Sequence, residues 1–105
     1  MKRIRVLVTG AGSGVGQSIA KALKLSNLNL KIFLADINLL NSGLYRFKNS
    51  ILTPKVEKPG ALKWYFKNLK KLKIDILMIG SEFDLVFFSK HANIIKKKLI
   101  VLYVV

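Results

Sequence analysis

A cluster of glycines near the amino terminus is the strongest chemical signal in the chain. Glycine lets a chain turn tightly and lets its backbone approach another group, and the helix after such a turn offers unpaired N–H groups and a positive dipole end to a phosphate. The cluster predicts a turn that contacts nucleotide phosphates. The alternative is that the glycines only let a strand turn into a helix. The cluster consists of Gly10, Ala11, Gly12, Ser13, Gly14, Val15 and Gly16.

The glycine spacing is a variant of the dinucleotide-binding fingerprint. Gly10, Gly12 and Gly16 read G-x-G-x-x-x-G, whereas the strict pattern is G-x-G-x-x-G. Val15 therefore stands where that pattern has its third glycine. No P-loop lysine follows the glycines, so a P-loop is excluded.

An acidic residue follows the turn at the distance expected of a ribose ligand. Asp36 ends an apolar stretch about 20 residues beyond Gly16, where such folds place a carboxylate that accepts hydrogen bonds from a ribose hydroxyl. The alternative is an Asx-turn, in which the same carboxylate caps the following loop. The residues alone leave both open.

A second polar group follows a later apolar stretch and opens a helix with Gly80, Ser81, Glu82 and Asp84. Ser81 or Asp84 can cap the unpaired amides there. Glu82 and Asp84 could act as a base or a metal ligand, but acids at this end of a helix are more often complements of its dipole. His91 has no catalytic partner in sequence and is expected to be a packed or surface residue.

The apolar patterns predict alternating strands and helices, hence a parallel sheet with helices on both faces. We expect an α/β, Rossmann-like three-layer sandwich of about five strands in the order 3-2-1-4-5. The glycine turn, Asp36 and the Gly80 segment would then meet at the carboxyl edge of the sheet, where ligands bind. The strands are expected over 4–9, 30–35, 50–53, 75–79 and 99–105, a loop over 38–43, and the helices over 15–26, 60–73 and 81–98.

Length and composition limit the possible classes of protein. The 105 residues suit a single domain over 1–105, and 51% hydrophobic residues exclude a disordered chain. The absence of cysteine excludes disulfides, thiolate metal sites and a cysteine nucleophile. The apolar runs are too short for a membrane helix, so we expect a soluble, cytoplasmic protein without a membrane partner.

The charge is strongly basic, with 19 Lys and Arg against 5 Asp and Glu and a net charge of +14. Such a charge is compatible with binding to nucleic acid or another polyanion. Only Arg3, Arg5 and Arg46 are arginines, however, and base readout favours the bidentate arginine side chain. We therefore favour solvated lysine-rich faces, do not expect a nucleic-acid partner, and retain a stand-alone polyanion-binding module as an alternative.

The segment over 99–105 is an apolar, β-forming run at the carboxyl end. An exposed apolar strand favours aggregation and is usually covered. We expect either that the chain is the first part of a longer protein or that another subunit covers this strand, for example in a homodimer.

The opening segment resembles the short-chain dehydrogenases. The residues Thr9-Gly10-Ala-Gly-Ser-Gly14-Val-Gly16 fit their T-G-x-x-x-G-x-G turn, and Ala35-Asp36-Ile37-Asn38 suits their adenosine-ribose acid. The resemblance implies an NAD(P)-binding domain of an oxidoreductase. Their N-A-G motif is replaced by Ile79-Gly80-Ser81-Glu82, and no Tyr-x-x-x-Lys pair is present.

The whole chain resembles the amino-terminal pre-ATP-grasp domain of carbamoyl-phosphate-synthase-like ATP-grasp proteins. The resemblance implies a carboxylate–amine ligase that acts on a small-molecule substrate with ATP and magnesium held by a downstream ATP-grasp domain. This chain would then not catalyse the ligation by itself, and its glycine turn, Asp36, Gly80, Ser81 and Glu82 would wall the substrate side. We take this as the leading hypothesis and the NAD(P)-binding domain as its alternative. The matching segments are Val8–Gln17, Ala35–Asn38, Ser42–Tyr45, Thr53-Pro54, Ile74–Leu77 and Gly80–Leu85.

Overall fold

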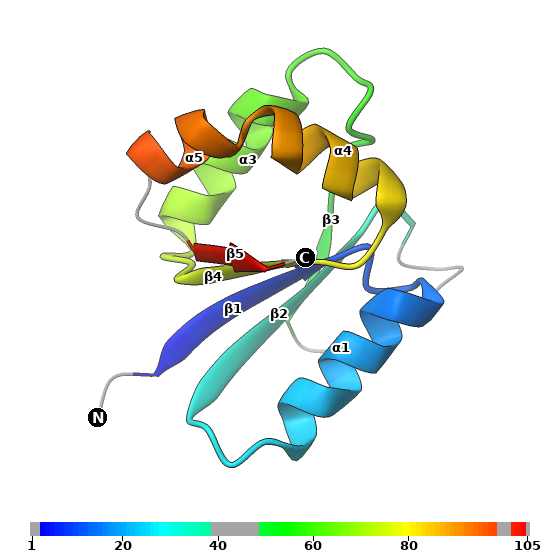
Figure 1. The fold of residues 1–105 in the computed structure, drawn as a ribbon, viewed down its shortest axis with the longest axis vertical. Helices are drawn as coiled ribbons and strands as arrows, with labels where there is room; N and C mark the ends of the chain where they lie inside the picture. Colours follow the sequence, from blue (N-terminus) through cyan, green and yellow to red (C-terminus); the bar gives the residue numbers. More distant parts are fainter. Residues whose placement is uncertain (1–2, 39–48, 99–101, 105) are drawn as a thin grey trace.

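The chain folds as strands and helices that alternate around one parallel sheet (Figure 1). The structure is a computed structural model and describes residues 3–38, 49–98 and 102–104. The elements in chain order are β1 (Ile4–Thr9), α1 (Gly14–Leu25), β2 (Leu30–Asp36), β3 (Ser50–Leu52), α3 (Ala61–Lys71), β4 (Ile76–Ile79), α4 (Glu82–Lys90), α5 (Ala92–Lys98) and β5 (Leu102–Val104).

The sheet has five parallel strands in the order β3-β2-β1-β4-β5, which confirms the expected fold class. The central strand β1 pairs with β2 on one side and β4 on the other, so that Val6 is opposite both Ile32 and Ile76. β2 and β3 lie on one side of β1, whereas β4 and β5 lie on the other, so the strand order switches direction between β1 and β4. The segments that follow β1, β2 and β4 therefore meet at one edge, as the sequence predicts.

Alternate residues of the strands pack against opposite layers of helices. Val6 and Val8 belong to the apolar cluster on the α1 side, together with Ala20 of that helix. Leu7 points to the other side and joins the cluster that includes Tyr65 of α3. Figure 1 shows α1 on one face of the sheet and α3, α4 and α5 on the other. Burial on both faces explains why the strands read as continuous apolar runs.

The helix expected over 81–98 is divided in the structure. α4 ends at Lys90 and α5 begins at Ala92, because His91 leaves the helical region with φ −105° and ψ 12°. The hydrogen bonds continue through this bend, since the N–H of His91 donates to the carbonyl of Phe87 at 3.2 Å. The rings of His91 and Phe87 lie 4.9 Å apart. His91 is therefore a packed residue at a bend.

Part of the sequence interpretation lies outside the described residues. The loop expected beyond Asn38, the segment Ser42–Tyr45, and positions 99–101 and 105 of the last strand belong to this group. Over the residues that the structure describes, no helix is both long enough and apolar enough to cross a membrane.

Candidate functional site

The turn between β1 and α1 is held in place by the hydroxyl of Ser13. Its oxygen accepts a hydrogen bond from the N–H of Gly16 at 3.0 Å and so caps α1. The same oxygen lies 2.7 Å from the carbonyl of Gly10 and 2.6 Å from that of Gly80. Because a hydroxyl has one proton, it donates to one of these carbonyls at a time. Ser13 thus links the glycine turn to the end of β4.

Three glycines are required because other atoms of the chain fill the space that a Cβ atom would take, and one of them also has a positive φ. A Cβ at Gly16 would lie 2.1 Å from the oxygen of Gly10, and one at Gly80 would lie 2.3 Å from the oxygen of Thr9. Gly10 has φ +55°, and its Cβ would lie 2.9 Å from that of Ser81. Gly16 is therefore the glycine that packs closely in this turn, one residue later than in the strict fingerprint. Position 15 needs no glycine and is occupied by Val15.

The start of α1 is open and carries free donors. A Cβ at Gly14 would meet nothing within 4 Å, and 63% of Val15 is exposed. Within the described part of the chain, the backbone N–H groups of Gly14 and Val15 have no acceptor, as expected for the first turn of a helix. These two N–H groups, at the positive end of the α1 dipole, are able to bind an anion.

Asp36 forms the Asx-turn that was one of the two alternatives. Its Oδ1 accepts from the N–H of Asn38 at 3.0 Å, and its Oδ2 accepts from the N–H of Gly12 at 2.8 Å. The carboxylate thus ties the end of β2 to the glycine turn. Each carboxylate oxygen has two acceptor positions, so these bonds leave room for hydroxyl donors from a ligand.

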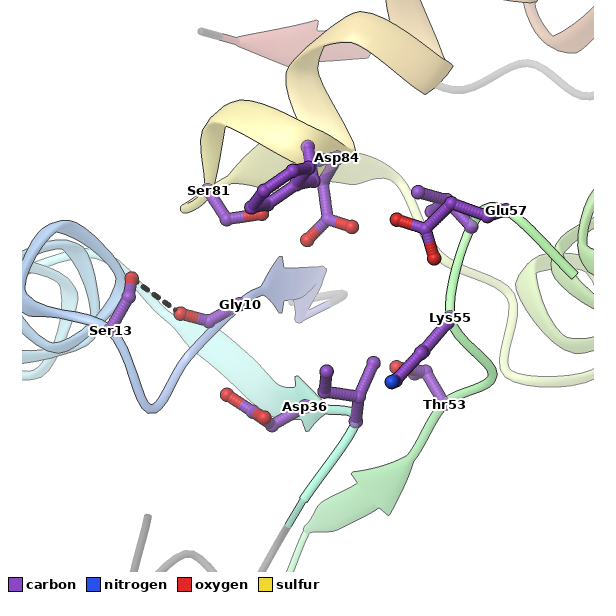
Figure 2. A pocket seen from close by; sticks show the side chains of 11 residues that line it. Gly10, Ser13, Asp36, Thr53, Lys55, Glu57, Ser81 and Asp84 are labelled. Carbon is purple, nitrogen blue, oxygen red and sulfur yellow. Dashed lines mark hydrogen bonds between the residues drawn. The ribbon is translucent and has the colours of Figure 1, made fainter. Parts of the chain in front are cut away.

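A pocket of about 350 Å³ opens at this edge of the sheet. Four of the predicted residues line it, namely Gly10, Ser13, Asp36 and Ser81. Figure 2 shows these residues arranged around the opening, with the carboxylate of Asp84 facing it from α4.

The other predicted residues surround the pocket without lining it. Ala11, Gly16 and Gly80 are buried beneath the turn, whereas Gly12 is partly buried. Gly14 and Val15 are exposed at the start of α1. Glu82 is also exposed and lines a neighbouring hollow with Phe83 and Val86. A ligand-contacting role for any of these residues stays a prediction.

Sequence reasoning missed one wall of the pocket. Thr53, Lys55, Val56 and Glu57 line it from the connection between β3 and α3 (Figure 2). Only the Thr53-Pro54 step had been noted there. A short β-forming segment followed by polar residues was the available signal, because β3 ends at the same edge as β1 and β2.

Burial shifts the pKa of Asp84, which lines the pocket, and that of Tyr65, which lies in the core. Burial raises the pKa of Asp84 above its ordinary value, and the carboxylates of Asp36 and Glu57 act in the same direction, while hydrogen bonds from Ser81 and Thr9 oppose the shift. Burial also raises the pKa of Tyr65, and Asp84 adds to that shift. The three carboxylates that line the pocket, Asp36, Glu57 and Asp84, repel further negative charge, whereas the start of α1 attracts it.

Comparisons with known proteins support the fold and contradict the leading hypothesis. The sequence matches no family model, and no curated protein matches it. The fold matches a dTDP-glucose 4,6-dehydratase from Bacillus anthracis, in complex with NAD, with a TM-score of 0.65 and 15% identity over 95% of this chain and 36% of that one. It matches an ADP-L-glycero-D-manno-heptose-6-epimerase from Helicobacter pylori with a TM-score of 0.61 and 21% identity over 96% and 38%. The chain thus spans less than two fifths of either protein.

These matches correct the leading hypothesis. The assignment to the pre-ATP-grasp domains, with its ligase function, is wrong, because the chain adopts the Rossmann fold of a dehydratase and an epimerase. The motifs quoted for that assignment follow strands β1, β2 and β4, where any doubly wound sheet needs tight turns and polar residues. Their order thus reflected the architecture and not the family.

Proposed function

We propose that this chain is the NAD(P)-binding domain of an oxidoreductase-type enzyme related to nucleotide-sugar dehydratases and epimerases. The observation that carries the proposal is the combination of free N–H groups at the start of α1 with a carboxylate at the end of β2, on either side of one turn. The NAD named for the matching dehydratase supports it.

The side chains fit the parts of a dinucleotide. The N–H groups of Gly14 and Val15 would donate to the phosphates, since no side chain at Gly14 covers them. Asp36 would accept hydrogen bonds from the adenosine ribose. Ile37 and Phe83, both exposed and both lining the pocket, would cover the faces of the base.

The charges of the pocket favour NAD over NADP. Three carboxylates surround it, and the pKa of Asp84 is raised mainly by burial and further by the neighbouring carboxylates of Asp36 and Glu57. A 2′-phosphate beside Asp36 would add negative charge to this group, and Lys55 is the one cation in the described lining. Substrate binding and catalysis would depend on residues beyond this domain, and we retain the cytoplasm as its expected location.

The proposal is tested by measuring cofactor affinity with isothermal titration calorimetry and NADH fluorescence. We expect saturable binding of NAD⁺, weaker binding of NADP⁺, and little binding of ATP with magnesium. Asp36→Ala should lower the affinity for NAD⁺ by about tenfold to a hundredfold, because hydrogen bonds to a charged group contribute about 1.5–3 kcal/mol.

Glu82→Gln is the matched control, because it removes one exposed carboxylate from the same edge but outside the pocket. Its affinity for NAD⁺ should remain unchanged. Since Asp36 also supports the turn, circular dichroism must show that the Asp36→Ala chain is folded. A folded wild-type chain that fails to bind millimolar NAD⁺, or an Asp36→Ala variant of unchanged affinity, would contradict the proposal.

A further inference from the structure

The acidic side chains gather at one edge of the molecule. Asp36, Glu57 and Asp84 line the pocket, and Glu82 lines the hollow beside it. Asp75 lies elsewhere, where its carboxylate accepts from the N–H of Arg5 at 2.9 Å. These are all five acids of the chain, so the exposed lysines of α3 have no acidic side chain on their own helix.

α3 lies in one of the acid-free segments of the chain. No Asp or Glu occurs from Lys58 to Ile74. Four lysines of the helix are exposed and recur at intervals of three and four residues, which places them on one face. We call this face the α3 lysine stripe; it consists of Lys63, Lys67, Lys70 and Lys71.

The opposite side of α3 is fixed in the core. Tyr65 and Leu69 are each 1% exposed and belong to the apolar cluster under this helix. A helix that lies on a membrane must present its own apolar side to the lipid. α3 cannot do this while folded, so its stripe is available for electrostatic contacts only.

The lysine spacing and the first turn of α3 oppose its stability, whereas Lys70 and Lys71 suit the carboxyl end of the helix dipole. Lys63 and Lys67, like Lys67 and Lys71, are four residues apart, a spacing at which like charges repel. The first turn contains no acid, and Gly60 provides no side-chain cap. By contrast, α4 has the Ser81 cap and two acids in its first turn. α4 thus has a side-chain cap and acids in its first turn, whereas the first turn of α3, which contains Lys63, has neither.

We propose that the α3 lysine stripe binds the phosphate backbone of nucleic acid without reading its bases. A polyanion would supply the missing countercharge, and the lysines would contact phosphates as point charges. At 1.5 Å per residue the stripe extends about 12 Å along the helix, enough for several phosphates of one strand. This inference reverses the expectation from composition that nucleic acid is not a partner. Composition does not reveal that four of the five acids lie together at one edge of the molecule. It does not depend on the proposed cofactor.

The test uses a fluorescein-labelled 20-base-pair DNA duplex of arbitrary sequence and measures its anisotropy as the full chain is added at several NaCl concentrations. Four phosphate contacts predict a slope of log K against log salt of about −3.6. A second duplex of unrelated sequence should bind equally. The double variant Lys67→Gln with Lys70→Gln should reduce the slope to about −1.8 and weaken binding at low salt by at least tenfold.

The matched control is Lys21→Gln with Lys24→Gln, since both residues are exposed and have the same spacing on α1, across the sheet. This control should retain the wild-type slope and affinity. Equal losses in the two double variants would overturn the proposal in favour of a diffuse effect of net charge. Binding to phosphatidylserine vesicles but not to the duplex would also overturn it. Saturating NAD⁺ should leave duplex binding unchanged, so this test and the cofactor test fail independently.

Discussion

At the scale of single residues, Asp84 gives the molecule a specific pH dependence. Its pKa in the folded chain is raised above 3.8, mainly by burial. Between 3.8 and the raised pKa the folded state binds more protons than the unfolded state, so the free energy of unfolding falls as pH rises through this window. Asp84→Asn should remove this contribution and be more stable than wild type at pH 7. Urea unfolding between pH 3 and pH 8 measures it.

Glu82→Gln provides the comparison, because it removes a charge from the same helix end without removing a buried group. It should lower stability slightly at pH 7, since an acid in the first turn complements the helix dipole. The two substitutions therefore have opposite expected signs. Asp84→Asn that destabilises the chain at pH 7 would show that its hydrogen bonds outweigh the cost of burying its charge.

The glycine turn offers a second test at this scale. Gly16→Ala places a Cβ 2.1 Å from the carbonyl oxygen of Gly10, so α1 must shift, at a cost of about 1–3 kcal/mol or more in the free energy of unfolding. Gly14→Ala meets nothing within 4 Å and should stabilise the helix by up to about 1 kcal/mol. Chemical denaturation of both variants checks the pair. Equal effects would contradict the different roles assigned to these glycines.

The sequence predicted the parts of the pocket that follow regular signals. Gly10, Ser13, Asp36 and Ser81 each follow a recognisable strand, so their shared edge could be inferred before the structure. Thr53, Lys55 and Glu57 were missed because the connection after β3 has no periodic pattern, although the strand expected over 50–53 indicated that its carboxyl end lies at this edge. Which residues of this connection face the pocket depends on how it packs against the assembled sheet.

At the scale of elements, the carboxyl end of α3 contains a strained residue. Lys73 has φ 54°, the left-handed conformation that favours glycine. The N–H of Ile74 donates to the carbonyl of Leu69, and that of Lys73 donates to the carbonyl of Lys70, which is the Schellman pattern. Lys73→Gly should therefore raise the free energy of unfolding by about 1 kcal/mol.

Lys67→Gly is the control, because it introduces the same residue six positions earlier, in the interior of the helix. It should lower the free energy of unfolding by about 1 kcal/mol. Thermal and urea unfolding, followed by circular dichroism, distinguish the two directions. If both variants are destabilised, the Lys73 side chain makes a larger contribution than its backbone strain costs.

Element types were more predictable than element ends. Apolar runs flanked by turn residues identified β1, β2 and β4, and periodic apolar residues identified α1 and α3, since burial imposes these patterns. The bend at His91 was missed, because the acids before it and the lysines after it are electrostatically consistent with one long helix. The backbone angles of one residue leave no compositional signal.

At the scale of the whole molecule, strand order was predictable and family was not. The order β3-β2-β1-β4-β5 follows from alternating elements and the usual rules for crossovers. The same rules place glycines and polar residues after the same strands in many unrelated enzymes. A resemblance built on such positions therefore selected the right fold and the wrong family.

The close contacts of three glycines also affect how the molecule can evolve. A Cβ at Gly16 would lie 2.1 Å from the carbonyl oxygen of Gly10, and one at Gly80 would lie 2.8 Å from the Cα of Gly16. A Cβ at Gly10 would lie 2.9 Å from that of Ser81 and 3.2 Å from the carbonyl carbon of Gly80. Because the three glycines contact one another, their substitution effects should not add. A lineage that loses one of these glycines and survives the displacement of its neighbours would find the other two easier to lose. The three residues are therefore expected to be inherited, and lost, together.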